Sequence, residues 1–253
     1  MCTFVMVNRF QNACDGLRCF KCTFQIVLYA IGRNFCAGLD MKELESFASE
    51  TKVGDAEPSC EARKRLRFME HIRSLQRDMS AFEECPCPVI VALHGHCVGA
   101  GVDLATSCDI RLATRDCTIS VKEVDLGITA DMGTLSRLPH IVGHGVAMYL
   151  ALTAEGISGS DAEHKYNHFV LKTFDNYDKL LSYSLRLAQT IAKKSPVAVT
   201  MTKKMLLFQR SHTVQDGLEH VAILNASTLL GSEDVSKIFQ GRSSGHKPTF
   251  SKL

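Results

Sequence analysis

Short apolar runs that end in a glycine turn constrain the fold of this chain more than any other feature. Two of them, QIVLYA at 25–30 and PVIVALHG at 88–95, are rich in β-branched residues, and each leads through glycines into a helical pattern. DIRLAT at 109–114 is a third candidate strand. Strands that are apolar throughout are buried on both faces, which is typical of parallel sheets covered by helices. The sequence therefore predicts an α/β fold.

Helical patterns occupy much of the remaining chain. In EARKRLRFMEHIRSLQRDMSAFEEC, at 61–85, apolar residues recur every three or four positions, which predicts an amphipathic helix with a solvated charged face. From about residue 177 the pattern is mostly helical, and Pro196 marks one helix start, where proline is favoured. We therefore expect an α/β core over 1–150 and a helical C-terminal region over 151–253.

Composition excludes several functions. Apolar residues make up 45% of the 253, enough for a sizeable core. The formal net charge is only +2, with both signs interspersed, so we expect no nucleic-acid partner. No apolar run approaches the roughly 18 residues that a membrane-spanning helix needs, so we expect no membrane span.

Cysteine usage indicates a reducing compartment. The chain has eleven cysteines, an odd number, and most lie in apolar contexts such as those of Cys36 and Cys97, where a thiol acts as a small hydrophobe. Cys19 and Cys22 form a CxxC, and Cys85 with Cys87 a CxC. Neither motif is accompanied by a second pair of cysteines at the spacing that a zinc site needs, so we expect no metal site.

Two glycine loops are candidates for binding an oxygen atom. GRNFCAGLDMKEL and HGHCVGAGVDL each follow a predicted strand and enter a helical pattern. The first turn of a helix has N–H groups without an internal partner and carries partial positive charge. Two such loops from one sheet could each present a donor to one carbonyl oxygen, as in an oxyanion hole. Ordinary tight turns remain the alternative, and neither loop matches a nucleotide phosphate motif.

Three acids stand among apolar neighbours. Glu123 follows Asp103 by twenty residues, and Asp131 follows Glu123 by eight. A buried carboxylate is costly unless it is paired or protonated, so the trio indicates either a satisfied network or a reaction site. Taken singly, each acid has an ordinary structural interpretation. Asp103 could cap a helix or pair within one, Asp131 could cap a following helix, and Glu123 could pair with Lys122 or Arg111.

The motifs resemble those of the enoyl-CoA hydratase/isomerase (crotonase) superfamily. The resemblance rests on NFCAGLDM, CPCPVIVALHGHCVGAGVDLATSCDIRLAT, VKEVDLGITADMGTLSRLPHIVG and KKSPVAVTMTKKMLL, and it covers roughly residues 25 to 240. It implies a crotonase-like ββα spiral core with a helical C-terminal trimerisation region. It also implies an acyl-CoA substrate, with coenzyme A as part of that substrate and no separate cofactor.

The same resemblance assigns the binding residues. The two oxyanion donors would be the N–H groups of Leu39 and Ala100, and Ala100 replaces the glycine that is usual in the family. The residues implied in acyl-CoA binding are Ala37, Gly38, Leu39, Asp40, Met41 and Ala100.

The acids select the reaction within the family. Hydratases usually have an uncharged turn at the position of Asp131, whereas the trio resembles members that isomerise 3,5-dienoyl to 2,4-dienoyl thioesters. We expect Glu123 to serve C2, Asp131 to serve C6, and Asp103 to tune the pair, with the reverse assignment of Glu123 and Asp131 left open. An enoyl-CoA hydratase and a catalytically inactive binding protein of this fold are the alternatives.

The two ends of the chain carry further expectations. Ser251, Lys252 and Leu253 form an SKL tail, which an import receptor reads as a peroxisomal address, so we expect the peroxisome, with the mitochondrion as the alternative. The segment before residue 25 is shorter than its counterpart in the family. The resemblance therefore implies either that the chain is truncated or mis-spliced, or that its binding of coenzyme A is weakened. Family members form trimers and dimers of trimers, so a homotrimer or homohexamer is expected.

Overall fold

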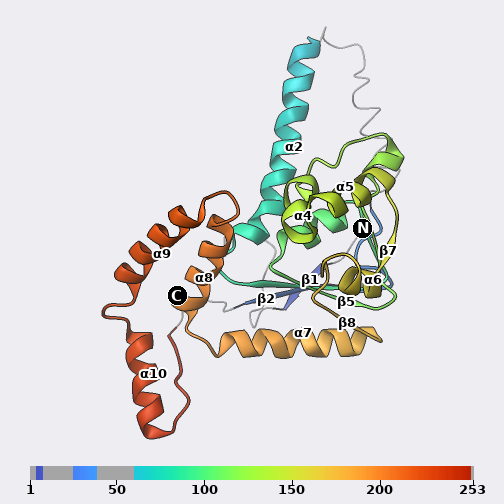
Figure 1. The fold of residues 1–253 in the computed structure, drawn as a ribbon. Coiled ribbons are helices and arrows are strands. Elements are labelled where there is room, and N and C mark those ends of the chain that lie inside the picture. The colour runs from blue at the N-terminus through green and yellow to red at the C-terminus, as the bar shows by residue number, and fades with distance from the viewer. Residues whose placement is uncertain (1–3, 8–24, 39–59, 252–253) are drawn as a thin grey trace.

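The structure is a computed structural model, which describes residues 4–7, 25–38 and 60–251 (Figure 1). The strands are β1 (Phe4–Val7), β2 (Ile26–Ala30), β3 (Val89–Leu93), β4 (His96–Val98), β5 (Ile110–Thr114), β6 (Thr118–Ser120), β7 (Ile157–Ser158) and β8 (Lys172–Phe174). The helices are α2 (Glu61–Glu84), α3 (Ala100–Ser107), α4 (Thr134–Val142), α5 (His144–Thr153), α6 (Gly159–His164), α7 (Tyr177–Ala192), α8 (Pro196–Phe208), α9 (Val214–Thr228) and α10 (Glu233–Ser244), and a 3₁₀ helix spans Glu123–Leu126.

The strands form two sheets. The larger has the order β1-β2-β3-β5-β8, in which β2, β3, β5 and β8 are parallel and β1 is antiparallel to β2. The smaller has the order β4-β6-β7. The three predicted strands are thus confirmed as β2, β3 and β5, and they are neighbours in the larger sheet.

Burial on both faces explains why these strands are apolar throughout. Val91 and Leu93 of β3 belong to the main core, which also contains buried residues of α3, α4 and α5. Ile90 and Ala92, which alternate with them, pack in a second cluster with Leu180 of α7. Figure 1 shows α7 running beneath the sheet and α4 and α5 on the other side. The predicted α/β arrangement is therefore confirmed.

The sheets continue past residue 150. β7 pairs with β6, β8 pairs with β5, and α7 packs on the larger sheet. The expected boundary at 150 therefore falls inside the α/β unit, and the purely helical part consists of α8, α9 and α10. These three helices lie beside the sheet rather than over it (Figure 1).

Capping side chains start the C-terminal helices. Ser195 accepts a hydrogen bond from the backbone N–H of Ala198 and precedes Pro196 at the first position of α8. Thr213 and Asp216 form a reciprocal capping box at the start of α9. Local sequence thus specifies where these helices begin.

A buried lysine fastens α8 to the α/β unit. The Lys203 ammonium lies 2.7 Å from Oδ2 of Asp109, just before β5. It also donates to the backbone carbonyls of Phe82 (3.2 Å) and Cys87 (3.1 Å). Three oxygen atoms from distant parts of the chain therefore surround a single buried cation.

Helix α2 matches its predicted bounds, but only part of its apolar face is covered. Met79 and Phe82, near its end, pack against the main core. Leu66, Phe68 and Met69, near its start, are exposed, and Figure 1 shows that end of the helix projecting above the body. The described part of the chain therefore leaves the first half of the predicted apolar face uncovered.

The cysteines expected inside the protein are buried. Cys97 and Cys108 lie in the main core together with Cys36 and Cys117. Burial raises the pKa of the Cys108 and Cys117 thiols to about 12, so they behave as small apolar side chains. Cys19 and Cys22 lie outside the described residues. Across the described ranges, none of the helices has the length and apolar character needed to cross a membrane.

Candidate active site

Backbone pairing brings the two glycine loops side by side. Cys36 and Cys97 form a parallel β-bridge, in which the Cys36 N–H donates to the His96 carbonyl (2.8 Å) and the Val98 N–H donates to the Cys36 carbonyl (2.9 Å). Gly38 and Gly99 come just after these residues, and both adopt positive φ angles. The two turns that sequence analysis singled out are therefore adjacent in space.

The start of α3 lies at this junction. Ala100 is the first residue of the helix, after the N-cap residue Gly99. Its N–H belongs to the first turn, whose donors have no partner within the helix. Gly38 lies against Val98, and a Cβ atom at position 38 would be 3.8 Å from Cγ1 of Val98. Ala37, Gly38 and Ala100 are thus at or beside the junction, whereas Leu39, Asp40 and Met41 lie outside the described residues.

Glu123 places its carboxyl group beside both loops. A Cβ atom built on Gly99 would lie 3.4 Å from Oε1 of Glu123 and 4.0 Å from the Cα of Gly38. The residue is only 8% exposed, and Oε2 is buried without a hydrogen-bond partner in the described part of the chain. Burial raises the pKa of Glu123, and repulsion from Asp103 and Asp131 raises it further. The Glu123 carboxyl group therefore keeps its proton to higher pH than an exposed one.

Asp103 is fully enclosed and connects two helices. Its residue exposure is 0%, and Oδ1 accepts a 2.7 Å hydrogen bond from the N–H of Thr134, the first residue of α4. Oδ2 is buried without a hydrogen-bond partner among the described residues. Burial raises the pKa of Asp103, while the Thr134 hydrogen bonds oppose the rise. Asp103 thus holds the start of α4, just after the segment that contains Asp131.

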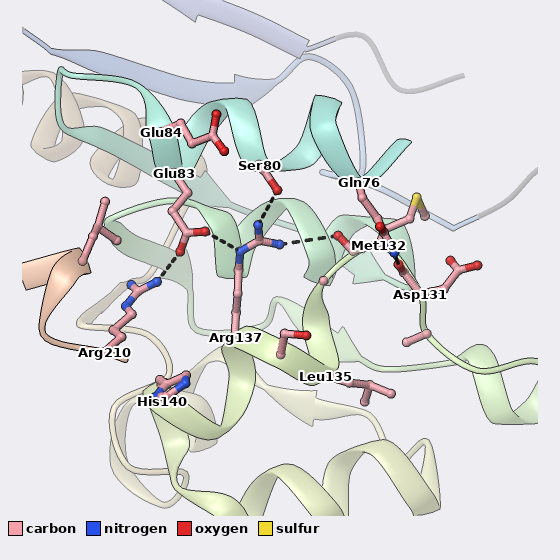
Figure 2. Close-up of a pocket in the computed structure, with 14 residues that line it drawn as sticks. Gln76, Ser80, Glu83, Glu84, Asp131, Met132, Leu135, Arg137, His140 and Arg210 are labelled. Atoms are coloured by element: carbon pink, nitrogen blue, oxygen red, sulfur yellow. Dashed lines mark hydrogen bonds and ion pairs between the residues drawn. The ribbon is translucent and has the colours of Figure 1, made fainter. Parts of the chain in front are cut away.

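Asp131 differs from the other two acids because its residue is exposed. It lines a pocket of about 570 Å³ between α2, α4 and the end of α8. Figure 2 shows the wall that faces it, which includes Gln76, Ser80, Glu83 and Arg137. The expectation of apolar surroundings therefore holds for Asp103 and Glu123 but is wrong for Asp131.

Asp103 takes one of the ordinary structural roles considered for these acids, at the start of α4, whereas the ion pairs considered for Glu123 go to other residues. Lys122 pairs with Asp125 at 2.7 Å, and the Arg111 guanidinium donates to backbone carbonyls, including that of Cys108 at 2.7 Å. Asp103, not Asp131, accepts from the first N–H of α4. Glu123 therefore does not form either of the ion pairs that the sequence offered, and Asp131 is not the α4 cap at this N–H.

Two side chains near the Asp131 segment, Gln76 and Arg137, make contacts that sequence analysis did not predict. Gln76 donates from Nε2 to the backbone carbonyl of Asp131 at 2.6 Å. Arg137 is 9% exposed and donates from Nε to Oε2 of Glu83 at 3.0 Å and from Nη2 to Oγ of Ser80 at 2.8 Å. The sequence signal that could have identified Arg137 is its charge within the otherwise mostly apolar pattern of α4.

The chemistry open to this arrangement is proton transfer beside a bound carbonyl group. Within the described ranges, no group of three or more His, Cys, Asp or Glu side chains is placed to hold a metal ion. Two enclosed carboxyl groups with raised pKa values stand next to a helix start that can receive an oxygen atom. A third carboxyl group borders the adjoining pocket.

Comparison with known proteins relates the chain to one family. Residues 10–239 match the family described as enoyl-CoA hydratase/isomerase. The chain is 43% identical over 228 residues to the peroxisomal Delta(3,5)-Delta(2,4)-dienoyl-CoA isomerase of Arabidopsis thaliana, covering 90% of this chain and 80% of the relative. It is 38% identical over 232 residues to the mitochondrial Delta(3,5)-Delta(2,4)-dienoyl-CoA isomerase of Homo sapiens, covering 90% and 68%.

Solved structures agree with the expected fold. An enoyl-CoA hydratase from Bacillus anthracis superposes with a TM-score of 0.76 at 25% identity, covering 90% of this chain and 81% of that one. A putative enoyl-CoA hydratase from Streptomyces coelicolor A3(2) gives a TM-score of 0.77 at 26% identity, covering 90% and 77%. The predicted crotonase-like core is confirmed by these likenesses.

Proposed function

Because the chain belongs to the enoyl-CoA hydratase/isomerase family, we propose that it isomerises 3,5-dienoyl-CoA to 2,4-dienoyl-CoA in the β-oxidation of unsaturated fatty acids. The relatives that match over 90% of the chain are named for this activity. One structural observation supports it above the others. The Glu123 carboxyl group lies beside the two glycine loops, while a separate carboxyl group, that of Asp131, borders the next pocket.

The first step removes a proton from C2 of the substrate. In the proposed arrangement, the thioester oxygen accepts hydrogen bonds from the N–H groups of Leu39 and Ala100, and the Glu123 carboxylate takes the C2 proton. The electron pair of the broken C–H bond then spreads from the thioester oxygen along the conjugated chain. Donors fixed in advance around such an oxygen stabilise the charge that develops there.

The second step delivers a proton to C6. Protonation at C6 moves the two double bonds to C2=C3 and C4=C5, so the product is the 2,4-dienoyl thioester. C2 and C6 are too far apart for one short carboxyl group to serve both easily, so we assign C6 to Asp131. No cofactor takes part in the proposed chemistry, and coenzyme A enters only as part of the substrate.

The reaction needs one carboxylate and one carboxylic acid at the same pH. Repulsion from Asp103 and Asp131 raises the pKa of Glu123, and repulsion from Asp131 raises the pKa of Asp103, so the charge on one acid affects the proton affinity of another. We propose that Asp103 tunes the pair and acts on Glu123 through its charge. The reverse assignment, with Asp131 at C2 and Glu123 at C6, remains the alternative.

Ala100 is compatible with its proposed role because the donor is a backbone N–H. The side chain at this position does not alter the hydrogen-bonding group. The added methyl group narrows the space beside the thioester compared with the glycine usual in the family. Ala37, Gly38, Asp40 and Met41 are the other residues to which we assign acyl-CoA binding.

Hydration of a 2-enoyl thioester is the second candidate reaction. The solved structures with this fold include proteins named enoyl-CoA hydratases. Such a reaction needs two glutamates to hold a water molecule, whereas this chain has Asp103 and Glu123 in those positions and an additional acid in Asp131. Isomerisation uses that additional acid, and hydration does not.

The names of the relatives support the proposed location. The Arabidopsis relative is named as peroxisomal and the human relative as mitochondrial, and we place this chain in the peroxisome, with the mitochondrion as the second location. The proposed import signal is Ser251-Lys252-Leu253, of which Lys252 and Leu253 lie outside the described residues. We propose a homotrimer or homohexamer, in which the C-terminal helices contact a neighbouring copy.

Replacing Asp131 by asparagine tests the proposed reaction. Asp131→Asn preserves the size of the side chain but cannot deliver a proton, so 3,5-to-2,4 isomerisation should fall by about 10²–10⁴. Exchange of the C2 proton with deuterated solvent should continue, because Glu123 and the loops are intact. Isomerisation is followed by the ultraviolet absorbance of the conjugated diene, and C2 exchange by mass spectrometry.

The outcome separates the candidates. Loss of both signals would mean that Asp131 is the C2 base or supports Glu123 directly. Isomerisation at the parent rate in a folded Asp131→Asn protein would remove Asp131 from the mechanism and favour the hydratase. A parent protein that hydrates 2-enoyl-CoA but leaves 3,5-dienoyl-CoA unchanged would overturn the proposed function itself.

A further inference from the structure

The backbone at Asp131, just before α4, is held by side chains from α2 and α4. The Gln76 side chain reaches from α2 and donates to the Asp131 carbonyl at 2.6 Å. Arg137, one turn into α4, reaches back and donates from Nη1 to the carbonyl of Met132 at 3.4 Å. Figure 2 shows both contacts converging on the same short segment. Two consecutive carbonyl groups are therefore restrained by two different side chains.

The Arg137 guanidinium is itself fixed to α2. It donates to Glu83 and Ser80, and Glu83 also pairs with Arg210 beyond the end of α8. A guanidinium with several such partners has a defined orientation, since its planar donors are used at fixed angles. Arg137 therefore links α2 to the backbone carbonyl of Met132, so the position of that carbonyl depends on the position of α2.

Gly133 leaves room for the Arg137 guanidinium because it has no side chain. Its φ angle is +126°, and a Cβ atom built there would lie 1.8 Å from Nη1 of Arg137. Any side chain at 133 would displace the guanidinium from the Met132 carbonyl. The glycine is thus required by a close approach as well as by its backbone conformation.

We propose that Gln76 and Arg137 are positioning residues for the Asp131 carboxyl group, a role that rests on the proposed function. The start of α4 is already held by Asp103 through Thr134, so the fold does not depend on Gln76 for this. Asp131 is exposed, and its carboxyl group must nevertheless meet C6 in a defined geometry. A misplacement of about 1 Å can reduce a rate by about 10². Fixing the two carbonyls at 131 and 132 supplies that geometry.

Gln76 allows positioning to be separated from folding, because Gln76 is exposed whereas Arg137 is buried and paired. Gln76→Ala should lower kcat for 3,5-to-2,4 isomerisation by about 10- to 100-fold, with little change in KM, since the misplaced acid acts after binding. C2 exchange should stay within about twofold of the parent. Gln76→Lys, which restores a donor on a longer side chain, should recover part of the rate. Arg77→Ala, at the exposed neighbouring position on α2, is the matched control and should keep parent values.

A second measurement does not depend on turnover. Amide hydrogen exchange over residues 130–133 should be faster in Gln76→Ala than in the parent and in Arg77→Ala. Parent kcat together with parent exchange in Gln76→Ala would overturn the positioning role while leaving the proposed function intact. Equal losses of isomerisation and C2 exchange would also overturn it, because the defect would then not be specific to C6. A parent protein that does not isomerise 3,5-dienoyl-CoA would remove the proposed function and this role together, whatever the exchange result.

Discussion

At the scale of single residues, the buried carboxyl groups of the proposed site lower the stability of the folded protein. Glu123 and Asp103 each bury a carboxyl oxygen that has no hydrogen-bond partner among the described residues. A group of this kind is expensive when charged, and proteins keep such groups mainly where function requires them. Activity and stability therefore favour different side chains at position 123.

Glu123→Gln should stabilise the protein at neutral pH. The pKa of Glu123 is raised in the folded state, so its contribution to stability is greatest below the unfolded pKa and decreases as pH rises to the folded value. Above that pH the ionised group destabilises the fold, and glutamine removes the effect. We expect a gain of about 1 kcal/mol at pH 8 that shrinks toward pH 4.5, measured by thermal unfolding. Glu84→Gln, at an exposed position of α2, is the control, and an equal gain at both pH values would contradict the explanation.

Sequence predicted part of this site. Asp103, Glu123 and the two glycine loops could be singled out because buried acids and strand–glycine–helix units leave a local pattern. The exposure of Asp131 could not be predicted, since it depends on how α2 and α4 approach each other. Gln76 was hidden for the same reason: on a charged, exposed helix face, nothing in the local sequence distinguishes it from its neighbours.

At the scale of elements, α8 depends on one buried ion pair. Lys203 is surrounded by Asp109 and two backbone carbonyls, and Asp109 also accepts from the N–H of Val89 at 2.7 Å. Burial raises the pKa of Asp109, and the lysine opposes that rise. The pair therefore joins the start of two central strands to a helix that lies beside the sheet.

Lys203→Met should destabilise the protein by about 3–5 kcal/mol, because it leaves Asp109 buried without its cation. Adding Asp109→Asn should restore part of the loss, since the remaining side chain is then neutral. Urea unfolding of the single and double variants measures both effects. Lys204→Met, at the exposed neighbouring position, should change stability by no more than about 0.5 kcal/mol, and an equal loss in it would rule out the ion pair as the cause.

Element boundaries were easier to predict than element partners. Helix α2 begins and ends within a residue of its predicted range, because its periodicity is continuous. Leu66 and Met69 of its apolar face are exposed, since periodicity shows that an apolar face exists but not what covers it. Helix α10 was not singled out, because its apolar residues are few and its start is marked mainly by the capping side chain of Ser232.

At the scale of the whole molecule, the C-terminal helices present apolar surface. Leu206, Leu218, Ile223, Leu230 and Phe239 are all more than half exposed. A pocket of about 630 Å³, lined mostly by apolar side chains, lies among α8, α9 and the start of α10. Surface of this kind is typical of contacts between protein chains.

We expect the protein to sediment as a trimer or hexamer and Leu218→Asp to shift it toward the monomer. A buried, unpaired charge in an interface opposes association. Leu171→Asp is the matched control, since Leu171 is 57% exposed and Leu218 is 58% exposed, and Leu171 lies before β8, away from the C-terminal helices. Analytical ultracentrifugation at several concentrations measures the shift. An unchanged assembly in Leu218→Asp would exclude this surface from the interface.

The position of Lys203 late in the chain also affects the order of folding. Its partners Asp109, Cys87 and Phe82 precede it by 94, 116 and 121 residues. During synthesis the strands and α2 emerge from the ribosome well before the cation that neutralises Asp109. Contacts at such separations close large loops and form slowly. The buried charge of Asp109 therefore gains its cation only after α8 has been made, so this contact is expected to be among the last to form in the α/β unit.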